Sequence, residues 1–114
     1  WVETISAPEE YKAAAEACAL AGMPWVGTMS FDTAGRTMMG LKPAGLGALA
    51  GEFACTPVAY GSNCGVGASD LLAAILDITQ AYPDAVVIAK ANCGIPVIQG
   101  DAVVYTGTPE LMGD

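Results

Sequence analysis

Short apolar segments alternate along the chain with longer segments in which apolar residues recur every three or four positions. The short segments predict β-strands at residues 1–5, 25–30, 57–61 and 85–89. The longer segments predict α-helices at residues 7–20, 43–55 and 70–81. A further extended piece is expected near residues 102–105, and Thr108-Pro109-Glu110 has the composition of a helix start. This alternation predicts parallel strands joined by helical crossovers.

Capping residues and glycines set the expected bounds of these helices. Ser6 is the expected N-cap of the first helix, with Glu9 completing a capping box, and Gly22 is expected to end it. The second helix starts at Pro43 and is rich in glycine, so its stability must come from packing. Ser69 is the expected N-cap of the third helix. Loops are expected at residues 31–40, 62–67 and 90–96.

The alternation predicts the α/β fold class, and two architectures of this class fit the chain. One is an open doubly wound sheet, and the other is part of a (β/α)₈ barrel. A complete barrel needs about 250 residues, so this chain of 114 residues would supply about half of one. We therefore expect residues 1–114 to form a single partial domain with no internal boundary.

The composition changes this picture in three ways. Apolar residues make up 54% of the chain and charged residues only 14%, which is typical of an internal segment of a larger fold. The net charge of −8 argues against nucleic acids and anionic membrane surfaces as partners, and no apolar run reaches the 18 residues of a membrane span. Four cysteines without a CxxC pair or a secretion signal favour the cytoplasm.

Candidate chemistry lies where the predicted strands end, because the carboxyl ends of parallel strands form the active-site face of α/β folds. The sharpest element is Gly61-Ser62-Asn63-Cys64-Gly65-Val66-Gly67, which places the Cys64 thiol at a strand end. Such a thiol serves as a nucleophile or a metal ligand. Cys18 and Cys55 fall in helical runs and Cys93 in a loop, and all three are interpreted as structural.

This segment at 61–67 resembles the zinc-cysteine motif of the homocysteine S-methyltransferase family. That family includes betaine–homocysteine methyltransferases and the homocysteine module of cobalamin-dependent methionine synthase. Three further matches follow in the family's order and cover the chain: Val2-Glu3-Thr4, then Ser30-Phe31-Asp32 with Gly35-Arg36-Thr37 and Gly40, and Ala89-Lys90-Ala91-Asn92-Cys93-Gly94-Ile95-Pro96.

The resemblance implies a (β/α)₈ barrel of which this chain covers about strands four to seven. It implies zinc-dependent transfer of a methyl group from betaine or a similar donor to the thiol of homocysteine, giving methionine. Cys64 would be the catalytic zinc ligand, and Glu3 would bind the ammonium group of homocysteine. Asn92 would lie near the metal, and Asn63 is a further candidate for substrate binding. Lys90 occupies a motif position without an assigned role.

The chain departs from the family at the metal. The family's other two zinc ligands form a Gly-Gly-Cys-Cys-Gly segment at the end of strand eight, and no adjacent cysteine pair occurs here. One thiolate cannot close a zinc site. The chain alone is therefore expected to be inactive. The missing pair is expected after Asp114 and the earlier strands before Trp1, so the remainder of the barrel is an expected partner, as is a homo-oligomer.

Two other interpretations stay open. The chain could be a non-catalytic α/β binding or dimerisation module that pairs through its open strand edges and carries a relic Cys64 loop. It could also be an open-sheet enzyme with a lone reactive cysteine. The absence of histidine weakens that third interpretation, because it excludes a Cys-His or Ser-His catalytic pair within this chain.

Overall fold

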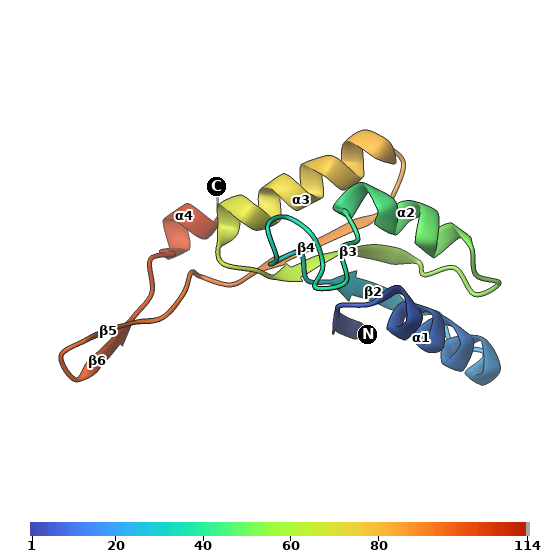
Figure 1. Ribbon diagram of the computed structural model, residues 1–114, viewed down its shortest axis with the longest axis horizontal. Coiled ribbons are helices and arrows are strands. Elements are labelled where there is room, and N and C mark those ends of the chain that lie inside the picture. The colour runs from blue at the N-terminus through green and yellow to red at the C-terminus, as the bar shows by residue number, and fades with distance from the viewer. Residues whose placement is uncertain (114) are drawn as a thin grey trace.

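Four parallel strands form the centre of the computed structural model, which describes residues 1–113. They lie in the order β1-β2-β3-β4, so neighbours in the sheet are also neighbours in the chain (Figure 1). Their bounds are Val2–Ile5 for β1, Val26–Met29 for β2, Ala59–Cys64 for β3 and Val87–Ala91 for β4. The predicted parallel α/β sheet is thereby confirmed.

Three helices occupy the connections between these strands, as predicted. They are α1 (Pro8–Ala21), α2 (Pro43–Gly51) and α3 (Ala68–Ala81). Figure 1 shows α2 and α3 lying side by side along the sheet. None of the helices within residues 1–113 combines the length and apolar content needed to cross a membrane.

The first helix begins one residue later than expected. Its N-cap is Ala7, and the carboxylate of Glu10 accepts hydrogen bonds from the backbone N–H groups of Ser6, at 3.0 Å, and Ala7, at 3.2 Å. These bonds lower the pKa of Glu10. The prediction of Ser6 as N-cap and Glu9 as its partner was wrong by one position. Gly22 ends the helix in the left-handed conformation, as predicted.

Four other boundaries differ from the sequence prediction. The cap of α3 is Gly67 rather than Ser69, and α2 ends at Gly51 rather than near Cys55. Strand β3 continues to Cys64, and β4 continues to Ala91, because these ends pair with each other in parallel register. Pairing between strands satisfies the backbone groups of residues that polar composition had assigned to loops.

A hairpin and a short helix complete the described chain. Strands β5 (Val97–Gln99) and β6 (Ala102–Val104) pair in antiparallel fashion and project away from the sheet, and α4 (Pro109–Gly113) follows (Figure 1). The extended piece near 102–105 and the helix start at 109 were predicted. The partner strand β5 was not, although Gly100-Asp101 between the short runs Val97-Ile98-Gln99 and Ala102-Val103-Val104 is a hairpin signal.

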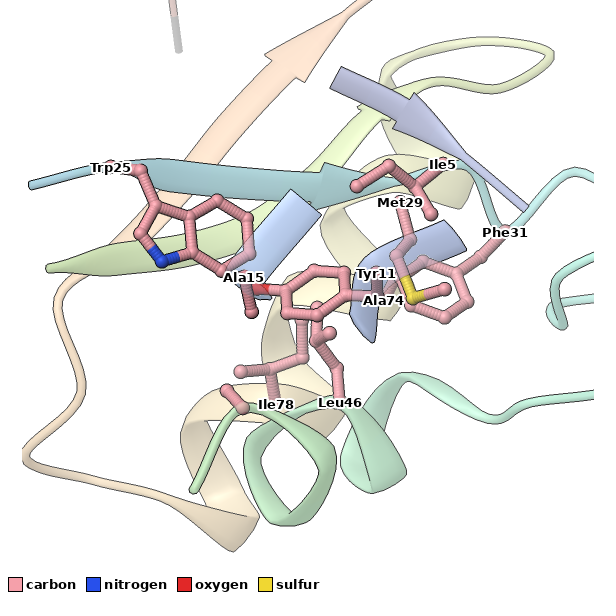
Figure 2. Packing of buried hydrophobic residues seen from close by; sticks show 10 residues of the cluster. Ile5, Tyr11, Ala15, Trp25, Met29, Phe31, Leu46, Ala74 and Ile78 are labelled. Carbon is pink, nitrogen blue, oxygen red and sulfur yellow. The ribbon is translucent and has the colours of Figure 1, made fainter. Parts of the chain in front are cut away.

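The core lies between one face of the sheet and the three long helices. Figure 2 shows the Tyr11 ring of α1 between Trp25, which directly precedes β2, and the side chains of Leu46 and Ile78 from α2 and α3. The Tyr11 and Trp25 ring centroids are 5.1 Å apart and the rings are tilted by 55°, which is a favourable aromatic geometry. Because all three helices share this cluster with Met29, they pack on the same face of the sheet.

Candidate functional site

Polar side chains from β1, β3 and β4 meet at the carboxyl edge of the sheet. Asn63 and Cys64 end β3, and their register partners in β4 are Lys90 and Ala91. Glu3 and Thr4 come from β1, where the register with β2 shifts between Val2 and Ile5. The structure thus brings Glu3, Asn63 and Cys64 to one edge, as the sequence predicted for strand ends.

The side chain of Asn63 is the centre of this group and is only 1% exposed. Its Oδ1 accepts hydrogen bonds from the backbone N–H of Thr4, at 2.9 Å, and from Oγ1 of Thr28, at 2.7 Å. Its Nδ2 donates to Oγ1 of Thr4, at 2.8 Å, and to Sγ of Cys64, at 3.1 Å. An amide group has two acceptor sites and two donor hydrogens. Protein groups therefore occupy all of them.

Two residues next to Asn63 adopt a backbone conformation that side chains disfavour. Thr4 and Cys64 both have φ of 64°, in the left-handed region. Such a conformation costs on the order of 1 kcal/mol or more for a residue with a Cβ, and it concentrates at functional sites. Both residues bond to the Asn63 amide, so one buried side chain holds both strained positions.

An ion pair joins the two outer strands above this group. Nζ of Lys90 lies 3.0 Å from Oε2 of Glu3 and 3.4 Å from Oε1. The strands that carry them, β4 and β1, are the two edges of the sheet, with β2 and β3 between them. The Lys90 side chain is 58% exposed and that of Glu3 is 40% exposed, so both charged groups are accessible from solvent.

Asn92 lies just beyond β4 and contacts the loop that follows Cys64. Its Nδ2 donates to the carbonyl oxygen of Gly65 at 3.2 Å, which ties the two loops together. Cys93 is half-buried, and its carbonyl oxygen accepts a hydrogen bond from the N–H of Gly107 at the base of the hairpin. A cavity of about 320 Å³ lies beside it, between the start of α3 and the segment that leads to α4.

Two contributors to this site were missed from the sequence or left without a role. Thr28 precedes the motif residue Ser30 by two positions, so the period of two in a strand places both on one face. Ser30 donates to the Asn63 carbonyl oxygen at 3.0 Å, beside the Thr28 bond to the same residue. Lys90 was noted only as a motif position, and the structure pairs it with Glu3.

The residues described here do not make a zinc site by themselves. Cys64 contributes one half-buried thiol. Within residues 1–113, no three histidine, cysteine, aspartate or glutamate side chains gather where they could hold a metal ion. Structural and catalytic zinc sites take at least three protein ligands. Any zinc bound at Cys64 must draw its other ligands from elsewhere.

Comparison with known families supports the resemblance found in the sequence. The family model described as homocysteine S-methyltransferase matches residues 1–114, which is the whole chain. No curated protein matches the chain.

Proposed function

Because the chain belongs to the homocysteine S-methyltransferase family, we propose that it is part of an enzyme that methylates the thiol of homocysteine to give methionine. The observation that carries this proposal is the family match over the whole chain. The site adds support, since Glu3, Asn63 and Cys64 come from distant segments and meet at one edge of the sheet. A cytoplasmic location belongs to the same proposal.

The sheet is proposed to be strands four to seven of a (β/α)₈ barrel, with residues 1–114 as part of one domain. Neither of the two common doubly wound orders places four successive strands side by side, whereas a barrel places all of them so. The order β1-β2-β3-β4 therefore supports the barrel. So do the open edges at β1 and β4, which neighbouring barrel strands would cover.

Each site residue has a role in this proposal. Cys64 is one zinc ligand, and bound zinc would keep the homocysteine sulfur deprotonated near neutral pH. Glu3 binds the ammonium group of homocysteine through a charge-assisted hydrogen bond. Asn92 lies by the Cys64 loop, near the proposed metal position. Asn63, expected to bind substrate, has its amide filled by protein groups, which supports a role in positioning Thr4 and Cys64.

The proposed reaction is a direct displacement at a methyl carbon. The sulfur lone pair of homocysteine forms the new S–CH₃ bond while the bond from that methyl group to the donor breaks. With betaine or a similar quaternary ammonium donor, the bonding electrons stay on nitrogen and the donor leaves as a neutral tertiary amine. Methionine and the demethylated donor are the two products.

The test uses the full-length protein, meaning the complete product of the gene that encodes this chain. It is incubated with homocysteine and betaine carrying a deuterated methyl group, with other cationic donors in parallel, and methionine is measured by mass spectrometry. Labelled methionine is expected only when both substrates are present, and cysteine in place of homocysteine serves as the thiol control. Formation of no methionine with any methyl donor would overturn the proposal.

The non-catalytic binding or dimerisation module remains a second candidate because the sheet edges are open and the hairpin is apolar. Ile98 in β5 is 79% exposed, and Val103, its partner in β6, is also exposed. An isolated two-stranded hairpin is at best marginally stable in water, so it needs a covering surface. A module of this kind would find that surface in a second copy of the chain.

The purified 114-residue chain is expected to self-associate into mixed assemblies, because part of a barrel leaves strand edges and apolar side chains uncovered. Sedimentation velocity over a range of concentrations measures this. A single discrete dimer would favour the dimerisation module instead. A stable monomer would contradict the partial barrel and a role in dimerisation.

A further inference from the structure

The ion pair between Glu3 and Lys90 has no evident structural purpose. Both side chains are well exposed, at 40% and 58%, and exposed ion pairs contribute little to stability. The two residues lie 87 positions apart in the chain and on opposite edges of the sheet. Their long side chains nevertheless meet above the site, where Lys90 Nζ lies 3.0 Å from Glu3 Oε2. This arrangement is better explained by a ligand that uses both charges.

We propose that Glu3 and Lys90 together recognise the zwitterionic head group of an α-amino acid, with Lys90 binding the carboxylate. The inference rests on the proposed function and adds to it the residue that selects the carboxylate end of homocysteine. An α-amino acid carries an ammonium and a carboxylate on one carbon atom, and a neighbouring carboxylate and ammonium complement them. Entry of the zwitterion exchanges one ion pair for two and leaves the net charge of the site unchanged.

The position of the pair relative to the thiol supports this assignment. Lys90 is the register partner of Asn63, and Ala91 is the register partner of Cys64. Glu3 precedes Thr4, whose N–H and hydroxyl both bond to Asn63. The Asn63 amide thus bonds to Cys64 and to the residue that follows Glu3, and Lys90 lies beside Asn63 in the neighbouring strand. A short amino acid bound by its head group would direct its side chain along this edge toward Cys64.

The other three basic residues of the described chain lie in or next to helices and loops, outside the strands of the sheet. Lys12 pairs with Glu16 on α1, and Arg36 donates to the Gly40 carbonyl oxygen in its own loop. Lys42 is the residue that precedes α2, and it makes no side-chain cap hydrogen bond. Lys90 is thus the base that the fold places beside Asn63 at the strand ends.

The test measures equilibrium binding to the full-length protein with three thiols that differ only at the head group. They are L-homocysteine, 3-aminopropane-1-thiol, which lacks the carboxylate, and 4-sulfanylbutanoate, which lacks the ammonium. In the Lys90→Met variant, the Kd for L-homocysteine and 4-sulfanylbutanoate should rise about tenfold or more, because a charge-assisted contact is lost. The Kd for 3-aminopropane-1-thiol should stay the same or fall.

Matched variants make the result specific. Glu3→Gln should weaken the binding of L-homocysteine and 3-aminopropane-1-thiol and leave the binding of 4-sulfanylbutanoate unchanged. Lys90→Arg should keep most of the affinity for L-homocysteine. Lys12→Met removes another exposed lysine and should change none of the three constants.

Three outcomes would overturn the inference. Tighter homocysteine binding in Lys90→Met would mean that Lys90 competes with the substrate ammonium for Glu3. An equal rise in the Kd of all three thiols in Lys90→Met would mean that the ion pair only holds the strands together. If wild type bound none of the three thiols, there would be no head-group site. Methionine formation is measured separately. A protein that shows the predicted binding pattern but makes no methionine would overturn the proposed function and leave this inference standing.

Discussion

Replacing Gly61 with alanine is expected to destabilise the full-length protein by about 3 kcal/mol or more. Gly61 lies in β3 directly opposite Ile88 of β4. A Cβ atom at position 61 would stand 2.7 Å from the Ile88 nitrogen and 2.8 Å from its carbonyl carbon, closer than real Cβ atoms approach other atoms. These are backbone atoms of a paired strand, so no side-chain rotation relieves the contact. The free energy of unfolding is measured by urea denaturation followed by circular dichroism.

Gly51→Ala provides the matched control for this substitution. Gly51 is the last residue of α2, and a Cβ there meets nothing within 4 Å. Alanine favours the helix over glycine, so this variant should unfold within about 1 kcal/mol of wild type, on the stabilising side. If the Gly61→Ala variant had the same free energy of unfolding as wild type, β3 and β4 would not approach each other as closely as described.

The sequence predicted the four parallel strands because their apolar runs lie at regular intervals between helical segments. It misplaced local boundaries, because these depend on contacts that single residues do not reveal. Ser6 and Glu9 have the composition of a capping box, yet the chain geometry gives this role to Ala7 and Glu10. Ser62 to Cys64 are polar or small and were assigned to a loop, yet pairing with β4 keeps them in the strand.

The candidate site shows the same division between composition and long-range geometry. The motif around Cys64 and the further matches along the chain indicated the family and placed Glu3, Asn63 and Asn92 as candidates. The hydrogen bonds of the Asn63 amide to Thr4 span 59 positions, and the ion pair between Lys90 and Glu3 spans 87. Both depend on strand register and on the irregularity in β1, which apolar periodicity does not encode.

Substitution of Cys64 by serine is expected to remove bound zinc from the full-length protein and to lower methionine formation by at least about 100-fold. This expectation follows from the proposed function, since substitution of outer partners of a metal ligand already costs about 10- to 100-fold. Zinc content is measured by elemental analysis after dialysis, and methionine formation by the deuterated methyl assay. Cys93→Ser is the control, because Cys93 is also half-buried and follows the next strand. It should retain both zinc and activity.

The serine variant isolates the sulfur because it preserves the surroundings of position 64. Serine has the same branching as cysteine, so it places no new strain on the φ of 64°, and its hydroxyl oxygen can still accept the hydrogen bond from Asn63 Nδ2. The fold and the Asn63 network should therefore persist, and unfolding by urea verifies this. Equal zinc content in wild type and Cys64→Ser would then show that Cys64 is not a metal ligand. That result would favour the non-catalytic module, in which the Cys64 loop binds no metal.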